Sequence, residues 1–354
     1  MASYRRSRTT SAARKDMISQ LPDDVKEKIL ECLPTSDAAR TALLSTDWKD
    51  VWLRNGRLVF DTHFFKCLRK CEGDKRVALV SIINDILLHR AGPVKKFTLV
   101  ISCPEDPKPQ QSDLDRWCRY LSRNGIEELN ISISGKKYRL PSCIVSCRTI
   151  TQLKLGGEGF DFDCLVNAGG VFPGVTSLVF RNVHFKNRIN GVVSNLEKLA
   201  FRYCVGVNNF KISAPKLKRL DLASACVFNT LERRWLLPHL RSIETLCIDG
   251  HLLSARIYVL SLHLKAIAAQ AFPTARNLQP SVWDDTARTL MRDSDDCFIN
   301  QDFEMLKTIK IESFSGSILE MHFVKALLSK SPALEKIVIQ ESADIDATIT
   351  PSLI

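Results

Sequence analysis

The chain has 354 residues, of which 45% are hydrophobic and 25% charged, with a formal net charge of +11 at pH 7. This apolar fraction excludes a largely disordered chain, and the length predicts about two to three folding units. Five of the positive charges lie within the first fifteen residues, which contain no acidic residue: Arg5, Arg6, Arg8, Arg14 and Lys15. We therefore expect a disordered basic arm over residues 1–15 and a mildly basic body behind it.

No secretory signal is recognisable, because the basic N-terminal stretch is followed by no apolar segment. The most apolar stretch, from Leu252 to Phe272, is interrupted by Arg256 and Lys265, so no uncharged run reaches membrane-spanning length. We expect an intracellular protein, in the nucleus, the cytoplasm or both, with no membrane partner.

The 12 cysteines contain no C-x-x-C pair. Cys67 and Cys71, like Cys143 and Cys147, are spaced to share a helix face, but reduced cysteines are ordinary small core residues. We expect no disulfide framework, no bound metal and no cofactor.

Three short helices are predicted over residues 16–60. Pro22 is followed by two aspartates, which indicates a helix start, and Pro34 ends this helix. Ser36 is expected to cap a second helix, and Asp47 a third that carries two tryptophans. A unit of about forty residues is too small to bury two tryptophans unaided. It should therefore dock on the rest of the chain or be covered by a partner.

This segment resembles the F-box. The resemblance rests on Leu21-Pro22, Ile29-Leu30, Leu33, Ala39-Arg40-Thr41, Leu44-Ser45, Trp48 and Trp52. The family commonly has a basic residue before the first tryptophan, where this chain has Thr46-Asp47. The resemblance implies binding to a Skp-family adaptor and, through it, to cullin and RING subunits. The adaptor-binding residues it implies are Leu21, Pro22, Val25, Ile29, Leu30, Leu33, Leu44, Trp48 and Trp52.

From residue 94 onward, short L-x-L segments recur. The repeats are centred on Leu129, Leu153, Leu178, Leu199, Leu220 and Leu246, and similar strands surround Phe97, Ile309 and Ile337. Gaps of 21 to 26 residues between the six leucines match leucine-rich repeats. Residues i and i+2 of a strand share a face, so pairs such as Leu153/Leu155, Leu199/Phe201 and Leu220/Leu222 should point into one core.

Stacking of these repeats predicts an α/β fold with a parallel sheet and an outer face of helices and loops. A doubly wound fold would need long helices between the strands, whereas the connections hold Gly156-Gly157, Pro173-Gly174 and Asn208-Asn209. An irregular leucine-rich-repeat solenoid over residues 61–300 is the better prediction. The glycine-rich run 156–159 is expected to be a turn, because it lacks the lysine of a phosphate loop.

The side chains between the inward leucines should line the open face of this sheet. They are Lys154, Arg181, Lys198, Arg202, Arg219, Asp221 and Asp249. The excess of cations favours a surface that binds an acidic partner. The alternative is an ordinary solvated sheet face.

Residues 306–340 predict a strand, a glycine-containing turn, a helix ended by Ser331-Pro332, and a second strand. Such a unit would cap the solenoid and hide its last edge. It resembles the FBD domain of a plant F-box/FBD/leucine-rich-repeat family, over residues 301–354. The residues that carry this resemblance are Phe314, Gly316, Glu320, Phe323-Val324-Lys325, Leu327-Leu328, Ser331-Pro332 and Leu334-Glu335-Lys336. Residues 254–300 lack regular strands and are predicted to be irregular.

No nucleophile elbow, phosphate loop, zinc-protease motif or dinucleotide fingerprint occurs in the sequence. The resemblance implies a non-catalytic receptor of a Skp-cullin-F-box (SCF) ubiquitin ligase, which presents an unknown target protein for ubiquitination. The alternative is a nucleic-acid-binding repeat protein that uses the basic arm and the basic inner face. An aromatic content of 8% and the lack of an RNA-binding motif argue against it.

Overall fold

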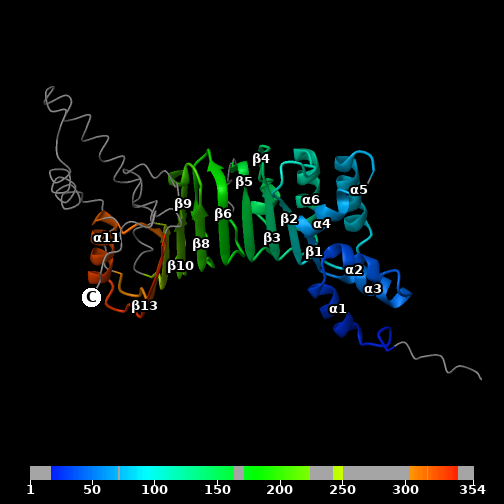
Figure 1. The fold of residues 1–354 in the computed structure, drawn as a ribbon, viewed down its shortest axis with the longest axis horizontal. Coiled ribbons are helices and arrows are strands. Elements are labelled where there is room, and N and C mark those ends of the chain that lie inside the picture. The colour runs from blue at the N-terminus through cyan, green and yellow to red at the C-terminus, as the bar shows by residue number, and fades with distance from the viewer. Residues whose placement is uncertain are drawn as a thin grey trace, which may run out of the picture.

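The structure, a computed structural model, describes residues 17–70, 72–162, 171–223, 242–249, 303–316 and 318–341. A helical module lies at one end of a long parallel sheet, and a helix–strand unit lies at the other end (Figure 1). The basic arm predicted over residues 1–15 and the irregular region predicted over 254–300 lie outside the described residues. Within the described residues, no helix has the length and apolar character needed to cross a bilayer.

The predicted three-helix module is formed by α1 (Asp23–Cys32), α2 (Thr35–Thr41) and α3 (Thr46–Arg54). Two predicted caps are wrong. Pro34 precedes the first residue of α2, so Ser36 lies inside that helix. Ser45 has extended backbone and its Oγ accepts a hydrogen bond from the Trp48 amide at 3.3 Å, which places Asp47 inside α3. The third helix therefore begins before the expected residue, because a serine in extended conformation reaches its first turn.

The module docks on the rest of the chain, which is one of the two arrangements that its tryptophans required. Strand β1 (Arg57–Phe60) follows α3 directly and pairs in parallel with β2 (Lys96–Ile101). The Arg90 guanidinium, from the segment after α5 (Lys75–Leu88), lies 5.0 Å from the centre of the Trp52 ring. Arg90 also donates a hydrogen bond to the Asn55 carbonyl. Both contacts join the end of α3 to the repeat region.

A single parallel sheet runs through the described residues in the order β1-β2-β3-β5-β6-β8-β10-β11-β12-β13, and the short β4 (Tyr138–Arg139) pairs with the end of β5. The remaining strands of this sheet are β3 (Glu128–Ile133), β5 (Gln152–Phe162), β6 (Ser177–Phe185), β8 (Lys198–Arg202), β10 (Arg219–Ala223), β11 (Thr245–Asp249), β12 (Thr308–Phe314) and β13 (Lys336–Glu341).

The register confirms the predicted repeats. The predicted strand centres pair across the sheet in one unbroken row, which Leu58 of β1 extends at one end: Leu58, Phe97, Leu129, Leu153, Leu178, Leu199, Leu220, Leu246, Ile309 and Ile337. All of them except Ile337 are buried. The residues two positions later, such as Leu155, Phe201 and Leu222, are buried in the same core. Each repeat thus covers the apolar side chains of its neighbours.

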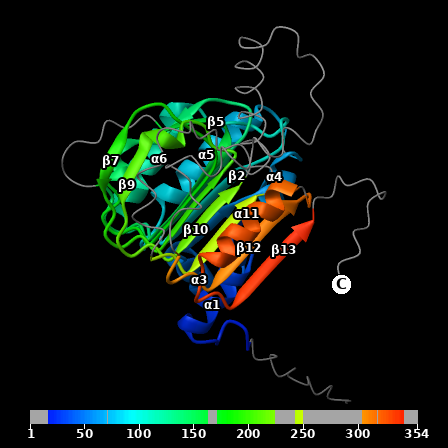
Figure 2. The same ribbon diagram turned by 90° about the vertical axis from the view of Figure 1, so that its left-hand side faces the viewer.

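One face of the sheet is covered. Figure 2 shows α5, α6 (Gln111–Arg123) and the small sheet of β7 (Ile189–Val192) and β9 (Phe210–Ser213) on the same side of the long sheet. The shorter elements of the chain are α4 (Thr62–Leu68), which packs on β1, α7 (Ser142–Val145) and the 3-10 turn η1 (Val207–Asn209). The opposite face of the sheet carries the side chains that alternate with the buried row.

The predicted turn at residues 156–159 is wrong, because β5 continues through all of them. The pairing of β5 with β6 shifts register between Gly156 and Phe160, and Gly157 has a φ of +116°. Glycine adopts this backbone without a steric penalty, so the strand bends where another residue would end it. The bend carries Phe160 and Phe162 into the core.

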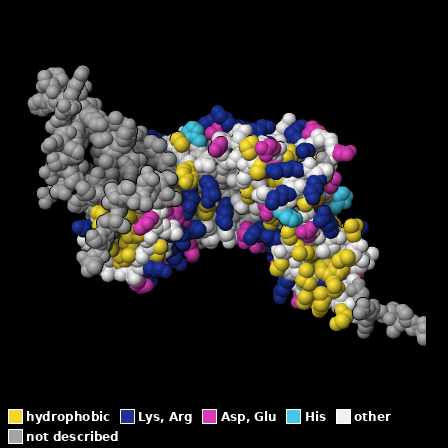
Figure 3. Space-filling view, in the orientation of Figure 1, with side chains coloured by type: hydrophobic (Ala, Val, Ile, Leu, Met, Phe, Trp, Pro, Cys, Tyr) yellow, Lys and Arg dark blue, Asp and Glu magenta, His cyan; other side chains and the backbone are white. Residues whose placement is uncertain are grey.

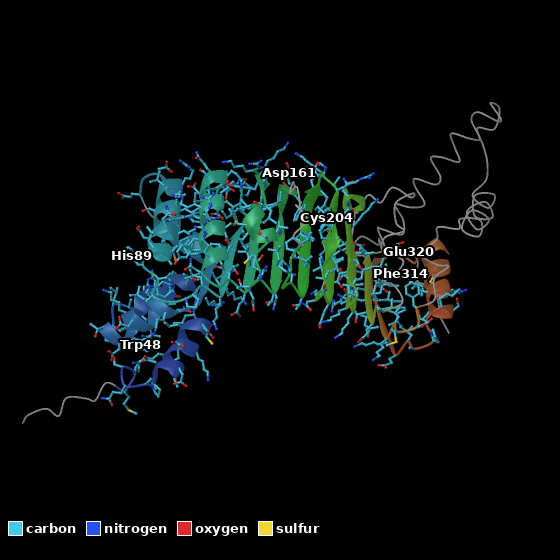
Figure 4. All side chains as sticks on the ribbon, turned by 180° about the vertical axis from the view of Figure 1, so that it is seen from behind. Trp48, His89, Asp161, Cys204, Phe314 and Glu320 are labelled. Carbon is cyan, nitrogen blue, oxygen red and sulfur yellow. The ribbon has the colours of Figure 1, made fainter. Side chains whose placement is uncertain are left out.

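The C-terminal unit has the predicted order of strand, turn, helix and strand: β12, a turn with Gly316 at a φ of +74°, α11 (Ile318–Ser329) and β13. The buried Glu320 carboxylate accepts hydrogen bonds from the Ser315 amide at 3.0 Å and its hydroxyl at 2.6 Å, which fixes the turn. Glu320 and Trp48 mark the two ends of the molecule (Figure 4). The unit does not hide the last strand, because Ile337 and Ile339 of β13 remain exposed.

Candidate binding surfaces

The helical module carries an exposed apolar patch, defined by Met17, Ile18, Ile29, Leu43 and Leu44. Their side chains are 77%, 59%, 36%, 88% and 64% exposed. Figure 3 shows hydrophobic side chains gathered over the module in a broad area. Apolar side chains that cluster in this way on a protein surface mark sites of protein–protein contact.

A tight turn between α2 and α3 exposes two leucines of the apolar patch. The amides of Ala42, Leu43 and Leu44 donate to the carbonyls of residues 39, 40 and 41, so the chain winds in a narrow turn beyond the end of α2. Ser45 then caps α3. The Leu43 and Leu44 side chains on this turn project into solvent.

The predicted adaptor-binding residues divide into two groups. Pro22, Ile29 and Leu44 are exposed, and Leu21, Val25 and Leu33 are half-buried. Leu30, Trp48 and Trp52 are buried in this structure, where they support the module from within.

The inner face of α1 includes a lysine. The Lys26 side chain is buried, with its Nζ 5.9 Å from the centre of the Trp48 ring and 3.7 Å from Asp23 Oδ1. Lys26 and Leu30 therefore form the inner face of α1, and Ile29 turns outward. Three exposed members of the apolar patch were missed: Met17, Ile18 and Leu43. The signal for Leu43 was an apolar pair directly before a capping serine.

The second surface is the open face of the sheet. All seven residues predicted there lie on strands at positions that alternate with the buried row: Lys154 on β5, Arg181 on β6, Lys198 and Arg202 on β8, Arg219 and Asp221 on β10, and Asp249 on β11. Asp221 and Asp249 are buried all the same. The Asp221 carboxylate accepts a hydrogen bond from Arg219 Nε at 2.9 Å, so its role is to hold Arg219 rather than to meet a partner.

Besides Lys198, the open face of β8 to β12 carries a charge-balanced cluster of three cations and three carboxylates in the described residues: Arg202, Arg219, Lys310, Asp221, Asp249 and Glu312. Glu312 accepts hydrogen bonds from Arg202 at 3.4 and 3.5 Å and from Lys310 at 2.7 Å. Burial disfavours the charged form of Glu312, but the bond from Lys310 and the charge of Arg202 outweigh it and lower the Glu312 pKa.

Cys247 lies within this cluster, with its thiol 3.7 Å from Glu312 Oε1. Burial and the charges of Asp221 and Glu312 raise the pKa of Cys247 to about 12. The thiol therefore stays protonated at neutral pH and is a poor nucleophile. Within the described part of the chain, no three His, Cys, Asp or Glu side chains gather as metal ligands.

Replacing Glu312 with glutamine is expected to lower the free energy of unfolding by about 1 kcal/mol at pH 7, because two cations lose their carboxylate. A lowered native pKa stabilises the protein above the ordinary glutamate pKa, and this contribution is lost as the pH falls through the native value. Urea unfolding of both proteins at pH 7 and at successively lower pH measures the difference, which should shrink in acid. Glu304→Gln, at an exposed position, is the control; an equal loss there would contradict the expectation.

The free cations, Lys154, Arg181 and Lys198, lie on the neighbouring strands β5, β6 and β8. Within the described residues, none of them forms an ion pair or a side-chain hydrogen bond. Figure 3 shows Lys and Arg side chains over the middle of the sheet. A hollow of about 50 Å³ beside Lys154 is lined by polar side chains of β2, β3 and β5.

Known protein families match the helical module and the repeat region separately. The F-box domain model matches residues 18–60, and a model described as At1g61320/AtMIF1, LRR domain, matches residues 86–349. The F-box/FBD/LRR-repeat protein At1g13570 of Arabidopsis thaliana is 27% identical over 94% of this chain and 93% of the relative. Two further A. thaliana proteins match 59% of the chain: the F-box/FBD/LRR-repeat protein At5g56420, at 32% identity, and the FBD-associated F-box protein At4g10400, at 30%.

The matched segments span about half the length of the last two relatives, 49% and 51%, against nearly all of At1g13570. The repeat model alone covers more than half of this chain and includes β2 to β13. With an F-box before it and a leucine-rich-repeat sheet behind it, the chain belongs to the plant family of F-box/FBD/LRR-repeat proteins.

Proposed function

We propose that the chain is the substrate-recognition subunit of an SCF ubiquitin ligase. The observation that carries the proposal is the apolar patch on the F-box module, where Leu43 and Leu44 are 88% and 64% exposed. Burial of such side chains against a partner stabilises a complex by about 25 cal/mol for each Å² removed from water. A Skp-family adaptor covers the patch and links the chain to cullin and RING subunits.

The open face of the sheet holds the target protein, away from the module that binds the adaptor. The chain makes and breaks no covalent bond in this proposal. It holds target lysines near a ubiquitin-loaded enzyme and so raises their effective concentration. The site of action is intracellular, in the nucleus, the cytoplasm or both.

The double variant Leu43→Asp/Leu44→Asp is expected to weaken adaptor binding at least 100-fold, because two central apolar contacts become charges at a desolvated interface. Titration of the full chain with a purified Skp-family adaptor measures the affinity. Val192→Asp/Val205→Asp is the matched control, since these valines are also exposed but lie in the repeat region. Wild-type affinity of the patch variant for the adaptor, or an equal loss of affinity in the control, would contradict the proposal.

A further inference from the structure

We infer that the open face between β2 and β8 binds an acidic peptide segment of the target protein. This inference rests on the proposed function, since it names the chemistry of the target that the repeat surface would hold. Its foundation is the uneven distribution of charge over a face whose cations look equivalent in the sequence.

Neutralisation divides the open face into two parts. Arg202 and Lys310 are bound to Glu312, and Arg219 is bound to Asp221. These cations are therefore not available to a partner without breaking bonds within the protein. Between β2 and β8, the positive potential that remains is that of the free cations, which have no such partners in the described residues.

The spacing of the free cations suits an extended peptide. In the sheet register, Lys154 pairs with Val179, Arg181 lies two residues beyond Val179, and Lys198 pairs with Ser177. With strands about 4.8 Å apart and a rise of about 3.3 Å per residue, their Cα atoms lie roughly 8 to 14 Å apart. An extended peptide covers that distance in about three to five residues. Two or three acidic side chains in such a segment can each meet one cation.

The hollow beside Lys154 provides a place for one carboxylate. Lys96 and Glu128 both line it and neutralise each other in an ion pair of 2.6 Å, so Lys154 is its available cation. The side chains of Thr98, Asn130 and Gln152 also line it and form no hydrogen bond with one another or with other described residues. Since about 10–15 Å³ holds one water, a hollow of about 50 Å³ has room for a carboxylate group.

The floor of this region favours a peptide over a nucleic acid. Between the free cations lie Gly156 and Ala200, both buried by their neighbours, and the half-buried Val179. Sequence-tolerant binding of single-stranded nucleic acid relies on aromatic side chains that stack on the bases. The described open face of β5, β6 and β8 carries none.

The test is a fluorescence anisotropy titration of the full chain with a labelled peptide that has glutamate at every second position. The triple variant Lys154→Gln/Arg181→Gln/Lys198→Gln should bind this peptide at least tenfold more weakly than the wild type. The matched control Lys66→Gln/Lys75→Gln/Lys137→Gln removes the same charge from exposed positions elsewhere and should bind as the wild type does. Equal affinity in the triple variant, or an equal loss in the control, overturns the inference.

Two further probes identify the anion. A phosphoserine peptide of the same spacing separates a phosphorylated segment from a glutamate-rich one, and binding of either that depends on the free cations supports an anionic peptide. Tighter binding of a single-stranded RNA oligomer than of both peptides overturns the inference. Adaptor binding by the triple variant should be unchanged, so loss of the peptide site with adaptor binding intact leaves the proposed function standing.

Discussion

Replacement of Gly157 with alanine is expected to lower the free energy of unfolding by about 4 kcal/mol, the sum of backbone strain and overpacking. A Cβ at this position would lie 1.9 Å from the Ile133 carbonyl oxygen, and the φ of +116° is one that residues with a side chain rarely adopt. Neither β3 nor β5 can give way, because both are paired on two sides. Urea unfolding followed by circular dichroism measures the loss.

Gly73→Ala is the matched control for this prediction. Gly73 has a φ of +88°, but no atom lies within 4 Å of the position that its Cβ would take. Alanine there should cost only the backbone strain, about 1–2 kcal/mol. If Gly157→Ala costs no more than Gly73→Ala, the close approach of β5 to Ile133 does not exist in solution.

The repeat register could be predicted from the sequence because it depends on local periodicity. The L-x-L segments recur at a spacing that fixes which leucines meet, and the structure places Leu129, Leu153 and Leu178 in one row. The bend at Gly157 could not be predicted, because glycines indicate a turn and a bulged strand equally well. Only the Phe160 and Phe162 side chains, buried beyond the bend, distinguish the two.

The sequence predicted which side chains lie on the open face, but it did not predict which of their charges are neutralised. Strand alternation places Arg181 and Arg202 on the same face, and nothing in the sequence distinguishes a free from a paired arginine. Their difference comes from Glu312, which is 110 residues from Arg202 in the chain and lies three strands away in the sheet. No local pattern encodes a contact across that separation.

The exposure of the helical module was predicted least well. A family motif identifies residues that are needed, but it does not separate the core from the contact surface. Trp48 is buried beneath Lys26, whereas Leu43 stands in solvent beyond the end of α2. Exposure depends on which face of each helix meets its neighbours, and that is a property of packing.

Replacement of Phe180 with alanine is expected to lower the free energy of unfolding by about 3–5 kcal/mol, the range for a fully buried aromatic side chain. The Phe180 ring is stacked on Phe201 at 5.7 Å and meets three other rings edge-on, at 5.9, 5.2 and 5.4 Å: Phe162, Phe185 and Phe210. Each such pair adds about 0.5–1.5 kcal/mol beyond the burial of its area. The midpoint of urea unfolding measures the effect.

Phe180→Leu is the control variant: it tests whether the loss of stability comes from a cavity in the core or from any substitution on β6. Leucine fills more of the space than alanine but loses the same ring contacts, so it should cost less than Phe180→Ala. An equal cost for the two variants would contradict a cavity in the aromatic cluster as the cause.

Phe180 lies between Val179 and Arg181, whose side chains project from the opposite face. A change in the packing of Phe180 therefore shifts the backbone that positions the free cation Arg181. Phe180→Ala should weaken the binding of the acidic peptide even under conditions in which the variant protein remains folded.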